Sequence, residues 1–224
     1  MGEYLNQHGY TCLGIRLAGH ATRPEDMIRS RWTDWTTSVE DGYQLLHGVA
    51  DHIFLIGLSM GGVLALLMST RLSPRVEGVV AMSTPSRLPT DYPTWFIQLM
   101  SNVMRYRPKS NEPPGSGWFD QAAYKEHVSY PQNPVRSAAE LKKLILSMRL
   151  ALPKIDVPVL LIHSKDEKNI LPDNLEYIYE ELANTSDKTK LYLTGSGHVI
   201  PRDASRQQAF QATLEFIQRV DSQK

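Results

Sequence analysis

The sequence predicts an α/β fold, in which a mostly parallel sheet has helices on both faces and an inserted helical cap. Short runs rich in Val, Ile, Leu and Tyr alternate with segments of helical spacing. Several of these runs are continuously apolar, which is typical of strands covered on both faces. With 42% hydrophobic and 21% charged residues among 224, the chain is large enough to bury a full core.

Five runs have the length and composition of strands. They comprise residues 10–17, 53–57, 76–82, 157–163 and 190–193. Helical patterns separate several of these runs. Because a strand-helix-strand connection places successive strands side by side in the same direction, we expect parallel pairing.

Three segments between and after these strands have the spacing of helices. Apolar residues recur every three or four positions in 32–49, where Thr33 or Asp34 is available as the N-cap. Residues 60–72 are apolar nearly all round, which indicates a helix packed inside the fold. An amphipathic pattern over 210–217 predicts a last helix.

One connection is much longer than the others. About seventy residues separate the strand ending at Met82 from the strand starting at Val157, too many for an ordinary loop. Apolar spacing predicts one helix within 95–103 and another within 141–152. We therefore expect a core formed by residues 1–83 and 156–224, and a helical cap formed by residues 84–155.

Composition argues against several classes of protein. Formal net charge is zero and no long run of Lys or Arg occurs, so we do not expect a nucleic-acid partner. The single cysteine, Cys12, lies in an apolar run and is expected to be a buried thiol, which fits a reducing compartment. The first ten residues lack a secretory pattern, and no run approaches the ~20 apolar residues of a membrane span. We expect a cytoplasmic chain without stable membrane insertion.

A Gly-x-Ser-x-Gly pattern lies between an apolar strand and a buried helix. Gly57 and Gly61 flank Ser59, and side chains at either glycine are expected to collide with neighbouring backbone in the sharp strand-to-helix turn. Such a turn exposes the serine hydroxyl. It also directs the backbone N–H of Met60, at the positive end of the helix, to the place where an oxyanion develops. Ser59 is therefore the candidate nucleophile.

A serine hydroxyl needs a base, and the base needs an orienting carboxylate. Asp166 follows the strand 157–163 and is the first choice of acid, with the neighbouring Glu167 as the alternative. His198 follows the strand 190–193 in a Gly-rich turn and is the candidate base. Because strand ends meet at the same edge of a parallel sheet, we expect Ser59, His198 and the acid to come together.

Other functional patterns are weaker. His163 closes a predicted strand, where we expect it to hydrogen-bond nearby backbone. Trp95, Phe96 and Met100 of the predicted cap are candidates for an apolar acyl pocket, although a cap helix also needs a buried face for packing. No metal-ligand spacing and no phosphate-binding glycine loop occurs, so neither a metal nor another cofactor is indicated.

The chain resembles bacterial carboxylesterases and monoacylglycerol lipases of the α/β-hydrolase fold, of the small type with a short helical cap. The resemblance runs over the whole length and is carried by Gly9–Cys12, Gly19-His20, Asp34-Trp35, Gly57–Gly62, Asp166-Glu167 and Ser196–Ile200. It implies hydrolysis of small-molecule esters, either short and medium acyl esters or monoacylglycerols, through an acyl-enzyme on Ser59. The alternatives are a thioesterase or an amide hydrolase with the same triad, or a catalytically impaired or non-catalytic fragment that keeps the triad only as ancestry.

In one respect the sequence departs from this family. Its relatives have further N-terminal strands, one of which ends in a His-Gly-aromatic loop that donates a second oxyanion hydrogen bond. His8-Gly9 does not match that loop, because it lies just before a predicted strand. The family's strand order then places a gap between the strands 10–17 and 53–57. We therefore expect an N-terminally truncated chain, impaired in turnover by about 10²–10³-fold through the missing donor.

Overall fold

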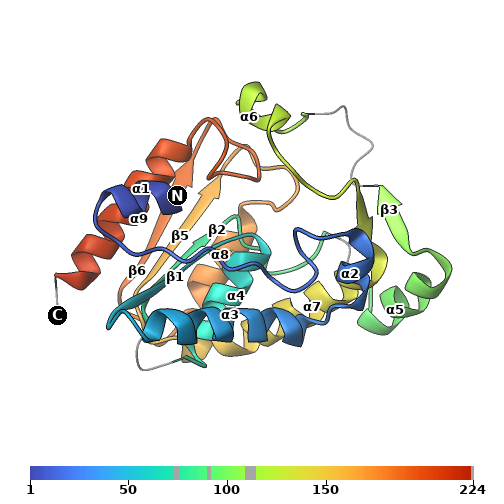
Figure 1. Cartoon of the computed structure of the whole chain (residues 1–224), viewed down its shortest axis with the longest axis horizontal. Helices are drawn as coiled ribbons and strands as arrows, with labels where there is room; N and C mark the ends of the chain where they lie inside the picture. The colour runs from blue at the N-terminus through green and yellow to red at the C-terminus, as the bar shows by residue number, and fades with distance from the viewer. Residues whose placement is uncertain (73–75, 90–91, 109–114, 223–224) are drawn as a thin grey trace.

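The computed structural model describes residues 1–72, 76–89, 92–108 and 115–222. Its main sheet has four strands in the order β1-β2-β5-β6 (Figure 1), which are β1 (Ile53–Leu58), β2 (Val76–Met82), β5 (Val159–Ser164) and β6 (Lys188–Leu193). All three strand pairs are parallel. The predicted parallel sheet is confirmed, as are four of the five predicted strands.

Helices cover both faces of this sheet. In chain order the helices of the described residues are α1 (Gly2–Gln7), α2 (Pro24–Arg29), α3 (Trp32–His47), α4 (Met60–Ser69), α5 (Thr94–Val103), α6 (Gln121–Lys125), α7 (Val135–Ala151), the 3₁₀ helix η1 (Leu152–Lys154), α8 (Asp173–Glu181) and α9 (Arg206–Asp221), of which α5 and α6 lie away from the sheet. Figure 1 shows α1 and α9 together on one side of the strands and α3, α4 and α7 on the other. No helix within the described ranges is both long and apolar enough to cross a membrane.

The core is divided by the sheet into two apolar clusters. On β2, Val79 and Ala81 belong to the cluster under α3, α4, α7 and α8, whereas Val80 and Met82 belong to the cluster under α1 and α9. Successive side chains of a strand point to opposite faces, so a strand that is apolar at every position is buried on both. The continuous apolar runs of the sequence therefore correspond to strands inside three layers.

Two boundaries differ from those expected. Helix α3 has Arg31 as its N-cap, and Asp34 is already inside the helix, where its carboxylate accepts the N–H of Arg31 at 2.8 Å. The prediction of Thr33 or Asp34 as the cap was therefore wrong. Helix α4 ends at Ser69, earlier than the predicted residue 72.

Residues 10–17 do not form the predicted strand. They pair with no strand, and β1 has a strand neighbour only on its β2 side within the described ranges. Between this segment and β1 lies a cavity of about 710 Å³, lined mainly by apolar side chains of both and of α3 and α4. A run of apolar residues becomes a strand only when another strand supplies its hydrogen bonds, and here the cavity occupies that place. Cys12 lines the cavity and is exposed, contrary to the buried thiol that we expected.

The connection from β2 to β5 contains the predicted helices. Helix α5 and the antiparallel pair β3 (Tyr106–Pro108) and β4 (Gln132–Pro134) lie at one end of the molecule, and α6 lies apart from them (Figure 1). Helix α7 instead buries Leu144, Ile145 and Met148 in the core cluster shared with α3 and α4. The division into a core and a cap of residues 84–155, of which 90–91 and 109–114 lie outside the described residues, stays a prediction.

Candidate active site

Ser59 occupies the turn between β1 and α4. Its backbone has φ 55° and ψ −118°, a left-handed conformation that is strained for a residue with a side chain. Its N–H donates to the carbonyl of Met82 at 2.8 Å, which ties the turn to the end of β2. Strain of this kind persists only where surrounding contacts impose it, and it is concentrated at functional sites. The local geometry is that expected for an exposed nucleophile on a sharp turn.

The glycines around Ser59 have different roles. A Cβ atom at Gly57 would lie 2.1 Å from the backbone carbonyl of Gly61, and one at Gly62 would lie 2.0 Å from Oγ1 of Thr84. A Cβ atom at Gly61 would meet nothing within 4 Å beyond its own helix. The expected collision is therefore present at Gly57 and absent at Gly61, and Gly62 carries the second steric requirement.

The N-terminus of α4 begins directly after the serine. Met60 is its first residue, so the N–H of Met60 has no acceptor in the preceding helical turn. The N–H groups of Gly62 and Val63 are already bound to the carbonyl of Ser59, at 2.9 and 3.1 Å. The Met60 N–H and the helix dipole thus provide a positive end beside Ser59.

His198 lies in the loop after β6 and faces a carboxylate from the loop after β5. Its Nδ1 atom is 2.7 Å from Oε2 of Glu167, whose side chain is buried. Asp166 was the expected partner, and this expectation was wrong. Its Oδ2 atom instead accepts the backbone N–H of Gly195 at 2.7 Å. The two acids are adjacent in a turn and point to different parts of the same loop, and only the glutamate reaches the imidazole.

Glu167 is held in place by its own turn. Its Oε1 atom accepts the N–H groups of Asn169 at 2.6 Å and Ile170 at 3.2 Å, which leaves Oε2 for His198. Burial alone would raise the pKa of Glu167. The hydrogen bond and the charge of His198, together with the two N–H groups, outweigh burial and lower its pKa from the ordinary value. Because an ionised carboxylate only accepts, the proton between them resides on Nδ1, and Nε2 of His198 is the nitrogen left for base catalysis.

His163, at the end of β5, contacts the same turn. It is only 1% exposed at the end of β5, and its Nε2 atom lies 2.7 Å from the carbonyl oxygen of Ile170, which confirms the expected contact with backbone. A carbonyl only accepts, so Nε2 carries the proton. Burial lowers the pKa of His163, which keeps the ring neutral. His163 therefore fastens the end of the turn that carries Glu167.

Short side chains bind the loop of His198 to its neighbours. Ser164 donates its hydroxyl to the carbonyl of Ser196 at 2.5 Å, and the N–H of Ser205 donates to Oγ of Ser196 at 2.9 Å. The hydroxyl of Ser205 donates to the carbonyl of Thr194 at 2.5 Å. The start of α9 and the end of β5 thus hold this loop from two sides. Sequence spacing gave no signal for these contacts, because they join positions far apart in the chain.

The candidate acyl-binding residues lie on α5. Trp95 is 66% exposed, and its ring meets the ring of Phe96 edge-on at a centroid distance of 5.9 Å. The cavity of about 710 Å³ is not lined by Trp95, Phe96 or Met100. Their role in an acyl pocket stays a prediction. Within the described residues no group of three or more His, Cys, Asp or Glu side chains is placed to hold a metal ion.

Comparisons with known proteins found a matching family and similar sequences. A family model described as serine aminopeptidase, S33, matches residues 1–205. The chain is 27% identical to a carboxylesterase of Bacillus subtilis (strain 168) over 222 residues, which cover 99% of this chain and 86% of the relative. It is 30% identical to a thermostable monoacylglycerol lipase of Bacillus sp. (strain H-257) over 217 residues, which cover 97% and 83%.

Solved structures are also similar. One, described with LipS and LipT, two metagenome-derived lipolytic enzymes, superposes with a TM-score of 0.83 at 26% identity and covers 97% of this chain and 86% of its own. The monoacylglycerol lipase of Paleococcus ferrophilus has a TM-score of 0.71 at 18% identity, with coverages of 85% and 76%. The second likeness concerns the fold alone.

Proposed function

We propose that this chain, which belongs to the serine aminopeptidase S33 family of α/β-hydrolases and is an enzyme of the esterase and lipase type, hydrolyses carboxylic esters. Ser59, His198 and Glu167 carry out the reaction. The observation that carries the proposal is the 2.7 Å contact between Nδ1 of His198 and Oε2 of Glu167. It orients the imidazole so that Nε2 is free to serve a nucleophile. The substrates are short or medium acyl esters or monoacylglycerols.

The first half of the reaction forms an acyl-enzyme. Oγ of Ser59 attacks the ester carbonyl carbon while Nε2 of His198 takes the hydroxyl proton. The carbonyl oxygen becomes an oxyanion beside the N–H of Met60, and Glu167 stabilises the imidazolium. The tetrahedral intermediate then collapses. The bond to the alcohol breaks, and the alcohol leaves with the proton from His198.

The second half returns the enzyme to its starting state. Water attacks the acyl carbon and gives one proton to Nε2 of His198, and the bond to Oγ of Ser59 breaks. Ser59 regains the proton from His198, and the carboxylic acid is released. The turn between β1 and α4 keeps Ser59, which is half-buried, in the same strained backbone conformation through both halves.

The test combines covalent labelling with turnover. The protein is incubated with a fluorophosphonate, the adduct is mapped by mass spectrometry, and hydrolysis of nitrophenyl esters from acetate to decanoate is measured. We expect labelling at Ser59, its loss in Ser59→Ala, and a fall in kcat of about 10⁴-fold or more in that variant. A folded wild-type protein with neither label nor ester turnover would overturn the proposal.

The same assay separates the related substrate classes. Ester, thioester and amide analogues with one acyl group are compared by kcat/KM on the wild-type protein. We expect a higher kcat/KM for the ester than for the amide. A higher kcat/KM for the amide would instead indicate an amide hydrolase.

A further inference from the structure

A segment from the β2–β5 connection is docked against the loop of His198. A Cβ atom at Gly197 would lie 1.6 Å from the carbonyl oxygen of Gly117, so the two backbones touch with no room for a side chain. Gly117 itself has φ +79°, a conformation that glycine adopts readily. The backbone next to His198 therefore depends on where residues 117–120 lie.

Asp203 binds both of these segments. Its side chain is buried, with the residue only 1% exposed. Oδ1 accepts the N–H groups of Phe119 at 3.0 Å and Asp120 at 2.7 Å. Oδ2 accepts the N–H of Gly197 at 2.7 Å. One carboxylate thus joins residues 119–120 to the residue immediately before His198.

The junction formed by Asp203 with residues 119–120 and Gly197 depends on a single carboxylate. Oδ1 also accepts the N–H of Ala204 at 2.8 Å, so the carboxylate of Asp203 has four backbone donors. Hydrogen bonds to a charged acceptor are stronger than those between neutral groups, and a buried N–H left without an acceptor destabilises its conformation. Loss of the carboxylate therefore affects both segments together.

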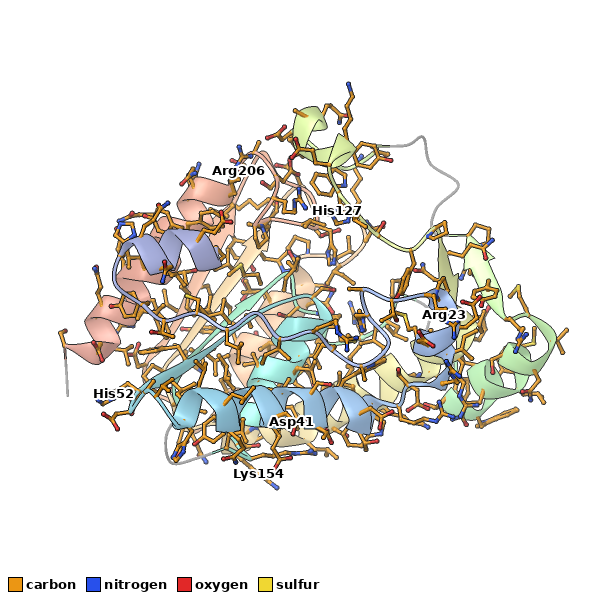
Figure 2. All side chains as sticks on the ribbon, viewed as in Figure 1. Arg23, Asp41, His52, His127, Lys154 and Arg206 are labelled. Atoms are coloured by element: carbon orange, nitrogen blue, oxygen red, sulfur yellow. The ribbon has the colours of Figure 1, made fainter. Side chains whose placement is uncertain are left out.

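A second contact anchors the docked segment from its other end. The carboxylate of Asp120 accepts the N–H groups of Ala122 and Ala123 at the start of α6, and its Oδ2 atom pairs with Nη1 of Arg206 at 2.7 Å. The same Nη1 atom donates to the carbonyl of Asp203 at 3.1 Å. Figure 2 shows Arg206, at the start of α9, and His127, just after α6, at the same end of the molecule. The beginning of α9 is thus the common support.

We propose that Asp203 is a positioning residue that couples residues 117–120 to the loop of His198, so that the imidazole keeps its contact with Glu167 only while this segment is docked. The inference rests on the proposed function for its effect on turnover. Asp203 does not touch the reacting atoms. It acts through Gly197, because the position of Gly197 sets the direction in which the side chain of the next residue, His198, points.

Substitution by asparagine separates the two halves of the junction. In Asp203→Asn, the amide oxygen replaces Oδ1 against the three N–H groups of Phe119, Asp120 and Ala204. The NH₂ group then faces the N–H of Gly197, and two donors cannot bind each other. The variant keeps the docked segment but releases the loop of His198.

The experiment measures amide hydrogen exchange by NMR and ester turnover on the full chain. In Asp203→Asn we expect exchange at Gly197 to rise at least tenfold while Phe119 and Asp120 stay protected. We expect kcat to fall at least tenfold with little change in KM. The matched control is Asp187→Asn. Asp187 lies just before β6, and its carboxylate is paired with Arg219 of α9. This variant should leave exchange at Gly197 and turnover as in the wild type.

A second variant reaches the junction without altering Asp203. Asp120→Ala removes the cap of α6 and the pair with Arg206, and we expect exchange at Phe119 and Gly197 to rise together. If the amide exchange rate at Gly197 stays at the wild-type value in both variants, the coupling is overturned. It is also overturned if exchange at Gly197 rises while kcat is unchanged. A wild-type protein with no turnover contradicts the proposed function instead, while the exchange data still report on the junction.

Discussion

Nδ1 of His198 lies 2.7 Å from Oε2 of Glu167, and Asp166, one residue earlier, accepts the N–H of Gly195 in the same loop. Both acids therefore contact the loop that carries the imidazole, but in different ways. Glu167 faces the ring and is placed to stabilise the imidazolium that forms when the base takes up a proton, whereas Asp166 holds the backbone three residues before it. The difference allows their roles to be separated by substitution.

Glu167→Gln removes the charge that orients and stabilises the imidazolium. We expect kcat for a nitrophenyl ester to fall about 10⁴-fold, the loss known for replacement of the acid of a serine triad by its amide. Asp166→Asn keeps an acceptor for the N–H of Gly195, so we expect a loss of less than about tenfold. The reverse order of the two effects, measured by steady-state kinetics, would return the acid's role to Asp166.

The ionisation of Glu167 links stability to pH. The pKa of Glu167 is lowered in the folded state from the ordinary value of 4.5. A lowered pKa means that the unfolded state binds the proton more readily, so this contribution is present above pH 4.5 and is lost as pH falls through the folded-state pKa. Urea unfolding between pH 3 and 6 should show a shallower acid loss in Glu167→Gln than in the wild type. Parallel curves for the two proteins would contradict this.

Burial of His163 gives a second pH dependence in a higher range. The folded-state pKa of His163 is lowered from 6.5, so its neutral form contributes stability above pH 6.5 that is lost as pH falls through the folded-state pKa. His163→Gln retains a side-chain donor for the carbonyl of Ile170 but does not titrate. We expect its free energy of unfolding to vary less than that of the wild type just below pH 6.5. His8→Gln, at an exposed histidine, is the control and should follow the wild type.

The glycines of the serine turn provide a matched pair for stability. Gly57→Ala places a Cβ atom 2.1 Å from the backbone of Gly61, and we expect a loss of about 3 kcal/mol or more in the free energy of unfolding. Gly61→Ala places a methyl group in open space within α4, where alanine favours the helix by about 1 kcal/mol. Urea denaturation of both variants tests this. Equal losses would show that the turn constrains both positions alike.

Local patterns were sufficient to predict much of the fold. The apolar runs of β1, β2, β5 and β6 lie within a parallel sheet, and the most continuous runs belong to the central strands β2 and β5, which are buried on both faces. The pattern around Ser59 likewise predicted a strand-to-helix turn, since its requirements are met by neighbours in sequence. The position of His198 at the same sheet edge followed from the order of the strands.

Tertiary structure decided what depends on partners distant in the chain. Whether Asp166 or Glu167 contacts the imidazole depends on how the loops after β5 and β6 lie against each other. The two residues are adjacent and both carry a carboxylate, so the sequence alone does not distinguish them. Residues 10–17 have the composition of a strand, but among the described residues no strand lies beside them to pair with their backbone. Asp203 acquires its role only because Phe119 and Gly197 converge on one carboxylate. Sequence alone thus determined most of the elements and the candidate nucleophile, whereas long-range hydrogen bonding selected the candidate acid and the contacts that hold the candidate base.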